Sequence, residues 1–251
     1  METKEKRQLT PREKRQRMEA RRKRQEEQRR RKQRQMWLLL GSLTAVLALV
    51  FLGFGVSKLV SREPKEITAQ GKSFVIALDP GHGGIDTGMM NGAAVEKEVT
   101  FKICSKLKIM LESQGYQVVM TREDDTRLSK EERVAAVNAS NADLLVSVHC
   151  CYAEDSAISG AISHYKADSS ASQYLGENIQ AALIKENGAK DGGVKEGSYT
   201  ILTDTVMPAV LIEVGYLSNT QEAEALAEDV YQNDTAKGIA KGIILSLDRE
   251  N

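Results

Sequence analysis

Hydrophobic and polar positions divide most of the chain into short apolar runs that alternate with helical patterns. Continuous apolar runs typical of buried strands occur near residues 74–78, 116–120, 144–148 and 209–212. Apolar residues recur with helical spacing over residues 99–111, and helical patterns also occur at 170–186 and 229–247. Residues 129–132 (SKEE) resemble a capping box that opens a helix through residue 137. Residues 160–165 are expected to add an edge strand. This alternation predicts an α/β fold over residues 73–248, a single-domain sandwich with a mostly parallel central sheet flanked by helices.

A different pattern precedes this domain. Residues 36–57 carry no charge and are apolar on every helical face, and 22 residues at about 1.5 Å each cross a hydrocarbon core of about 30 Å. A buried core helix and a cleaved signal peptide are the alternatives. The run exceeds a usual signal-peptide core, and no A-x-A cleavage site follows it. We therefore expect one transmembrane helix, joined to the domain by a linker over residues 58–72.

Charge is distributed very unevenly along the chain. Residues 1–35 contain 16 Lys and Arg against six Asp and Glu, although the whole chain is neutral with 35 of each kind. A basic segment beside a membrane span is expected to stay in the cytoplasm, next to the anionic inner leaflet. Nucleic-acid binding is the alternative reading of such a tail, and we do not expect it here. The prediction is a single-pass membrane protein with an extracytoplasmic domain.

Candidate chemistry gathers where apolar strands end. His82 follows the first strand, His149 ends the third and Glu213 ends the last, while Glu96 precedes the first long helix. Sites in open α/β sheets lie beyond the carboxyl ends of the strands, so these side chains are expected to converge. Two imidazoles and a carboxylate suit a catalytic zinc ion, and a second carboxylate, Glu213, would act as the base. His164 is expected to be structural or exposed.

Each of these residues also has an ordinary interpretation. A histidine after a strand is usually a hydrogen-bonded polar group, Glu96 resembles a solvated helix start, and Glu213 could pair with a cation. The sequence contains no short metal signature, such as two histidines one turn apart on a helix. Only the combination of these residues on the expected elements favours a metal site.

The same residues carry a family resemblance. The motifs occur in one order, as residues 76–86 (IALDPGHGGID), Glu96–Lys97, 121–125 (TREDD), Leu128, Arg133, 147–149 (SVH) and 208–219 (PAVLIEVGYLSN). Together they resemble zinc-dependent N-acetylmuramoyl-L-alanine amidases of the amidase-3 type. The resemblance implies one zinc ion held by His82, Glu96 and His149, with Glu213 catalytic. The implied reaction hydrolyses the amide between N-acetylmuramic acid and L-alanine of the peptidoglycan stem peptide.

The sequence departs from the family pattern beside the second histidine. Cys150 and Cys151 replace the usual Ala-Asn, and a thiol beside the zinc would be an inhibitory fourth ligand. The alternative to an enzyme is a catalytically silent membrane protein that binds peptidoglycan or regulates other hydrolases. An activator or regulator protein could gate the domain, or the domain could be open constitutively. The anchored layout also resembles sporulation and germination amidases, which leaves a developmental role open beside division and growth.

Overall fold

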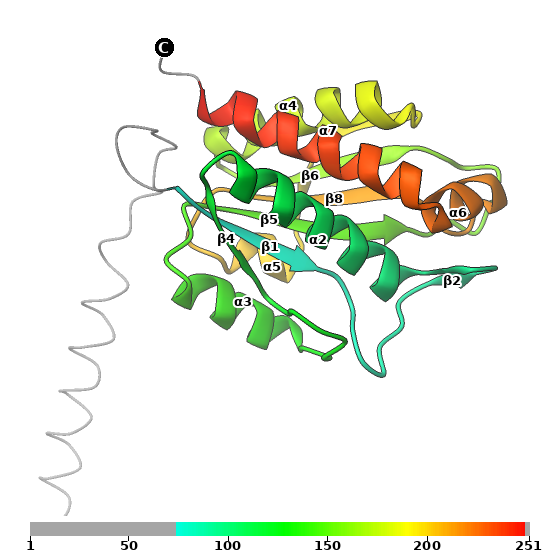
Figure 1. The fold of residues 1–251 in the computed structure, drawn as a ribbon, viewed down its shortest axis with the longest axis horizontal. Coiled ribbons are helices and arrows are strands. Elements are labelled where there is room, and N and C mark those ends of the chain that lie inside the picture. Colours follow the sequence, from blue (N-terminus) through cyan, green and yellow to red (C-terminus); the bar gives the residue numbers. More distant parts are fainter. Residues whose placement is uncertain (1–73, 249–251) are drawn as a thin grey trace, which may run out of the picture. The chain divides into compact units, whose positions relative to one another are not determined.

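The apolar runs form the centre of a six-stranded sheet in the computed structural model, which describes residues 74–248 (Figure 1). Across the sheet the strands are β4 (Gln117–Met120), β1 (Val75–Pro80), β5 (Leu144–Cys151), β8 (Ala209–Tyr216), β6 (Ala161–Lys166) and β7 (Asp191–Gly197). The first four strands run parallel, β6 is antiparallel to β8, and β7 is parallel to β6. The predicted α/β fold with a mostly parallel sheet is confirmed.

The strand predicted over residues 160–165 is confirmed as β6 (Ala161–Lys166), but its predicted place at the edge is wrong. Strand β6 pairs with β8 on one side and β7 on the other, so β7 is the edge. The sequence of β7, DGGVKEG, has two glycines and little apolar alternation, so its pattern does not indicate a strand. A polar, glycine-containing edge strand is less prone to pair with other chains.

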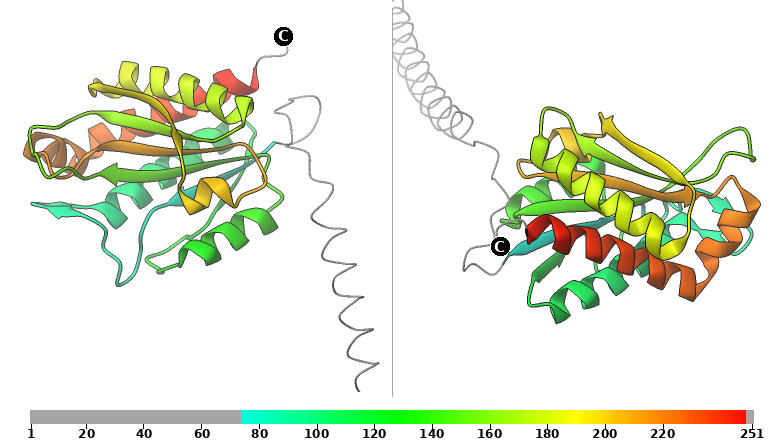
Figure 2. Two further views of the ribbon diagram at one scale, coloured as in Figure 1. Left: turned by 180° about the vertical axis from the view of Figure 1, so that it is seen from behind. Right: turned by 90° about the horizontal axis from the view of Figure 1, so that it is seen from above.

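Helices cover both faces of the sheet (Figures 1 and 2). The larger core lies against α2 (Glu96–Ser113), α4 (Ser170–Asn187), α6 (Thr220–Ala227) and α7 (Asp229–Leu247). The smaller core lies against α3 (Lys130–Ala139) and α5 (Thr200–Thr203). Strand β5 supplies both cores, because Leu144, Val146 and Val148 point to the larger one and Leu145 to the smaller one.

Local sequence signals explain where two of the helices begin. Ser129 caps α3 in a capping box, as predicted: its hydroxyl accepts from the Glu132 N–H, and the Glu132 carboxylate accepts from the Ser129 N–H. Helix α2 begins at Glu96, three residues earlier than its apolar spacing indicates, directly after the hairpin of β2 (Met90–Asn91) and β3 (Ala94–Val95).

The connections of the strands place the candidate site. From β1 the chain passes through α2 to β4 on one side, and then through α3 to β5 on the other side of β1. Connections therefore diverge at the carboxyl ends of β1 and β5, which is where open α/β sheets bind ligands.

Within residues 74–248, no helix is long and apolar enough to cross a membrane. The predicted basic tail (1–35), transmembrane helix (36–57) and linker (58–72) lie outside the described residues.

Candidate metal centre and active site

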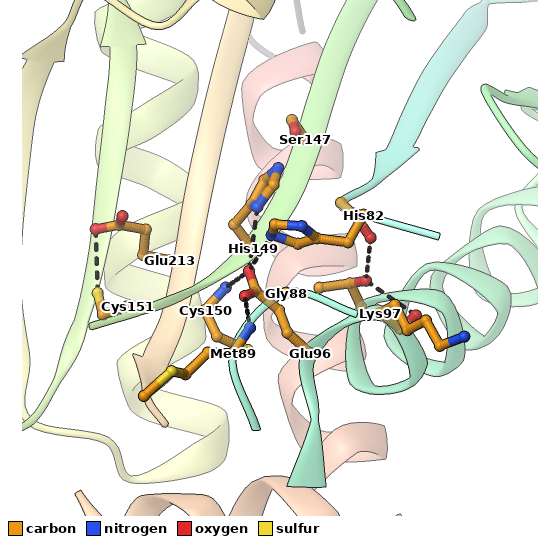
Figure 3. A network of polar contacts seen from close by, with 12 residues as sticks. His82, Gly88, Met89, Glu96, Lys97, Ser147, His149, Cys150, Cys151 and Glu213 are labelled. Carbon is orange, nitrogen blue, oxygen red and sulfur yellow. Dashed lines mark hydrogen bonds and ion pairs between the residues drawn. The ribbon is translucent and has the colours of Figure 1, made fainter. Parts of the chain in front are cut away.

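The three predicted metal ligands come together at the carboxyl ends of β1 and β5 (Figure 3). His82 Nε2 lies 3.1 Å and His149 Nδ1 lies 3.2 Å from the same oxygen, Oε1 of Glu96. The two imidazole rings meet edge to face, with centroids 5.1 Å apart. Each residue offers one ligand atom, and these atoms all lie within 4.8 Å of one another. Residues far apart in the sequence therefore form one cluster of donors.

Backbone groups hold the Glu96 carboxylate in place. Its Oε1 accepts a hydrogen bond from the Cys150 N–H at 2.9 Å, and its Oε2 accepts one from the Met89 N–H at 2.9 Å. Burial alone would raise the pKa of Glu96, but His149 and His82 outweigh it, and the net shift is downward. Glu96 is therefore a charged carboxylate in the folded protein, as a metal ligand must be.

A second carboxylate orients His82. Oδ1 of Asp86 lies 2.9 Å from Nδ1 of His82, while the opposite ring nitrogen points to Glu96. Metal-bound histidines typically donate their other N–H to a carboxylate in this way, which fixes the tautomer and raises the basicity of the ligating nitrogen. Asp86 thus prepares His82 Nε2 for a cation.

Two glycines make room for the cluster. A Cβ on Gly81 would overlap the ring of His149, and a Cβ on Gly88 would overlap the Glu96 carboxylate. Gly88 also has a φ of 63°, which disfavours other residues. The histidine and glutamate side chains therefore occupy space that only glycine leaves free.

The donor set fits zinc. Two nitrogens and a carboxylate oxygen are the ligand types of catalytic zinc sites, which keep a fourth position open. Ligand atoms bound tetrahedrally at about 2.1 Å lie about 3.4 Å from one another. The separations of 3.1 and 3.2 Å between the imidazole nitrogens and Glu96 Oε1 are close to that value. The same three residues are the only potential metal cluster that residues 74–248 contain.

An ion pair under the site holds the loop after β1. Arg133 of α3 bonds to the buried Asp79 carboxylate at 2.7 Å and to the carbonyls of Pro80 and His82. Burial would raise the pKa of Asp79, but Arg133 and hydrogen bonds from neighbours lower it overall. His82 has a φ of 59°, a strained conformation that these bonds maintain. The sequence motifs contained Asp79 and Arg133 but gave no reason for pairing them.

Glu213 lies beside this cluster on the neighbouring strand. It pairs with His149 across β5 and β8, so both side chains leave the same face of the sheet. Its Oε2 accepts a hydrogen bond from the Cys151 thiol at 3.0 Å (Figure 3) and lies 3.1 Å from His164 Nε2. The expectation that His164 is structural or exposed missed this contact with the predicted base.

A cleft of about 400 Å³ opens over these groups, within the size range of small-ligand pockets. It is lined by the cluster and Glu213, by residues at the start of α3, and by the segment leading into α5. The substrate would therefore reach both the metal ligands and the predicted base from one side, on the face of α3 and α5.

Neither thiol belongs to the donor cluster. Cys150 packs into the larger core, and Cys151 bonds to Glu213. Burial, more than the nearby carboxylates, raises the pKa of both thiols. The position of both thiols outside the donor cluster argues against the inhibitory-ligand hypothesis.

Known proteins are similar to this chain in sequence and in fold. A family model described as N-acetylmuramoyl-L-alanine amidase matches residues 76–245. The germination-specific N-acetylmuramoyl-L-alanine amidase of Bacillus subtilis (strain 168) is 35% identical over 200 residues, covering 73% of this chain and 83% of the relative. An N-acetylmuramoyl-L-alanine amidase from Clostridium difficile 630 has a TM-score of 0.69 at 32% identity, over 71% of this chain and 99% of that one.

A further solved structure contains the CwlD amidase from Clostridioides difficile in complex with the GerS lipoprotein. It has a TM-score of 0.66 at 34% identity and covers 69% of this chain and 98% of that one. The family model spans well over half of the chain, and the matched residues include the cluster and Glu213. The chain therefore belongs to the N-acetylmuramoyl-L-alanine amidase family.

Proposed function

We propose that this protein is a zinc-dependent cell-wall hydrolase. It cleaves the amide between the lactyl group of N-acetylmuramic acid and L-alanine of the peptidoglycan stem peptide. The observation that carries the proposal is the convergence of His82, Glu96 and His149 on one point, with Glu213 beside them in the same cleft. Membership of the amidase family supports the choice of bond.

The residues divide into two roles. His82, Glu96 and His149 hold one zinc ion, which when bound supplies the Lewis acidity that polarises an amide carbonyl and acidifies water. Glu213 takes a proton from the attacking water and passes it to the leaving amine of L-alanine. General acid–base help of this kind contributes about 10²- to 10⁴-fold to a rate.

The proposed location is the outer side of a cell membrane. The uncharged run at residues 36–57 would anchor the chain, and the basic residues before it would keep the N-terminus in the cytoplasm. This arrangement brings the catalytic domain to peptidoglycan, its proposed substrate.

A protein partner is a further part of the proposal. One solved relative is an amidase in complex with a lipoprotein. By analogy, a membrane-attached activator or regulator would control this enzyme, in a developmental process such as sporulation or germination or in growth.

The full-length chain, purified in detergent and incubated with muropeptides, tests the reaction. We expect free stem peptide by mass spectrometry from the parent and none from Glu213→Ala, while zinc stays bound in both. Loss of zinc from Glu213→Ala would make Glu213 a ligand. A parent that binds zinc but releases no stem peptide would favour the catalytically silent alternative.

A further inference from the structure

The carboxylate of Glu213 is held from one side only. Its Oε2 receives the Cys151 thiol at 3.0 Å and lies 3.1 Å from His164 Nε2. Its Oε1 has a single long contact among the described residues, with the Tyr199 hydroxyl at 3.4 Å. One oxygen is therefore saturated with donors and the other is almost free.

His164 lies behind Glu213, outside the cleft. Glu213 and Tyr199 line the cleft, whereas His164 and Cys151 do not. The His164 side chain is 12% exposed, and its ring meets the ring of Tyr199 edge to face with centroids 5.1 Å apart. A substrate in the cleft would meet Glu213 directly, and His164 could act only through that carboxylate.

The fold makes a specific place for the imidazole. A Cβ on Gly197 of β7 would come within 3.0 Å of His164 Cβ and of the Tyr199 ring. The absence of a side chain at Gly197 therefore leaves the space that His164 occupies. His164 pairs with Leu211 on β8, two residues before Glu213. The backbone of Gly197 and the ring of Tyr199 therefore confine the imidazole, and its Nε2 lies next to the Glu213 carboxylate.

Hydrogen bonding defines the tautomer of His164. An ionised carboxylate only accepts hydrogen bonds, so Nε2 must carry the hydrogen that Glu213 receives. Nδ1 is buried and has no partner within the part of the chain that the structure describes. A second N–H at that nitrogen would be an unsatisfied buried donor, which is costly. His164 therefore presents a fixed N–H donor at Nε2 to the Glu213 carboxylate.

We propose that His164 is a positioning residue for the catalytic Glu213, holding Oε2 so that Oε1 stays free and aimed at the reacting water. The inference rests on the proposed function, since it takes Glu213 as the general base. His164 itself touches neither substrate nor metal ligand.

Electrostatics agree with the geometry. Burial would raise the pKa of Glu213, but hydrogen bonds from His164 and Cys151 more than offset it, and the net shift is downward. The titratable groups that face Glu213 are His149 and Cys151 on β5, His164 on β6, Tyr199 before α5, and Tyr216 on β8. Without the His164 donor, Glu213 would bind its proton more tightly and lose its base form at a higher pH.

The test compares His164→Phe with His164→Gln in the full-length enzyme. Phe fills the space without a donor, whereas the Gln amide can donate to the same oxygen. We expect His164→Phe to lower kcat by about 10- to 100-fold, because a misplaced catalytic group can cost about 10²-fold. KM should stay within about threefold and the acid limb of the kcat–pH profile should move to higher pH. His164→Gln should recover most of the loss.

Controls separate positioning from folding and from the proposed function. Tyr165→Phe, on the same strand but packed against the larger core, should leave kcat unchanged. Zinc content and melting temperature are measured for every variant, and His164→Leu serves as a second variant without a donor if the Phe variant fails to fold. Unchanged kcat and acid limb in the variant without a donor would overturn the proposal, as would equal losses in the Phe and Gln variants. Activity remaining in Glu213→Ala would instead overturn the role of Glu213.

Discussion

At the scale of single residues, the candidate zinc site depends on how its ligands are supported. The ring of His82 is shared between two carboxylates, with Asp86 at Nδ1 and Glu96 at Nε2. Glu96 in turn is fixed by backbone N–H groups of Met89 and Cys150. Cys150 contributes only its main-chain N–H to this contact with the Glu96 carboxylate, so the unusual side chain at this position does not disturb it.

Asp86→Asn tests the support of His82. Losing the carboxylate partner of a metal-bound histidine costs about 10- to 100-fold in metal affinity, and we expect that loss here. Competition with a chelator for zinc measures it. Asp234→Asn, on α7 against the opposite face of the sheet, is the matched control and should bind zinc as the parent does. Unchanged affinity in Asp86→Asn would mean that Asp86 does not orient a ligand.

Asp79→Asn tests the ion pair beneath the site. Breaking a buried pair leaves Arg133 without its carboxylate, and we expect the free energy of unfolding at pH 7 to fall by about 3 kcal/mol. The pKa of Asp79 is lowered from its ordinary value of 3.8, so its stabilisation is present above that pH and is lost as the pH falls through the folded pKa.

Urea unfolding at pH 7 and at pH 3 measures this difference. The gap between parent and Asp79→Asn should shrink at the lower pH, because the parent begins to lose the same interaction. Asp155→Asn changes an exposed carboxylate that accepts a hydrogen bond from the nearby Ala157 N–H, and it should change the free energy by no more than about 0.5 kcal/mol. A gap that is constant across this pH range would show that the ion pair is not its source.

At the scale of elements, helices α4 and α7 pack with their backbones close together in the larger core. A Cβ on Gly242 would overlap the backbone of Ile179, and one on Gly238 would come within 2.6 Å of Leu183 Cα. Glycines four residues apart on one helix face let the two backbones meet. These helices cover the face of the sheet opposite the cleft.

Gly242→Ala tests this contact. The added methyl group would have to push the helices apart, and overpacking of this kind costs about 1–3 kcal/mol, offset partly by the better helix propensity of Ala. Thermal unfolding measures the loss. Asn233→Ala, exposed on the same helix, is the control and should be nearly neutral. A Gly242→Ala variant as stable as the parent would mean that the helices can separate at little cost.

Elements with long, regular patterns could be predicted from the sequence, and short or polar ones could not. The helix after Ser129 was predicted from its capping box, and the core strands from their apolar runs. Strand β7 lacks such a pattern, and β2 and β3 have two residues each. Their pairing comes from tertiary contacts, which override weak local preference.

The candidate site could be predicted in part, because three of its residues lie at the ends of strands that the apolar runs predict. His82, His149 and Glu213 follow or end apolar strands, so their meeting could be expected from parallel-sheet geometry alone. His164 could not be placed, because its strand was expected at an edge rather than beside β8. Once β6 pairs with β8, period-two alternation brings His164 to the face that carries Glu213.

At the scale of the whole molecule, the proposal joins a catalytic domain to a membrane anchor. Residues 1–35 carry a net charge of about +10 and the rest of the chain about −10. The acidic part includes the domain, so the anionic membrane surface would attract the tail and not the domain.

Deleting residues 36–57 tests the anchor. The full-length protein should sediment with membranes and resist extraction by high salt, because an apolar span is not held by charge. After a salt wash, the deletion variant should be found in the supernatant and not in the membrane pellet. Removing residues 1–35 alone should leave the protein in the membrane fraction. A full-length protein that salt releases would be held by its basic tail instead of a span.

The proposed function requires one zinc ion held by His82, Glu96 and His149. Anomalous diffraction at the zinc absorption edge, from crystals of the zinc-loaded protein, tests this most directly. We expect one strong peak per chain, about 2.0–2.2 Å from a nitrogen of each histidine and from a carboxylate oxygen of Glu96. A peak coordinated by Glu213, Cys150 or Cys151, or no peak at the cluster, would contradict it.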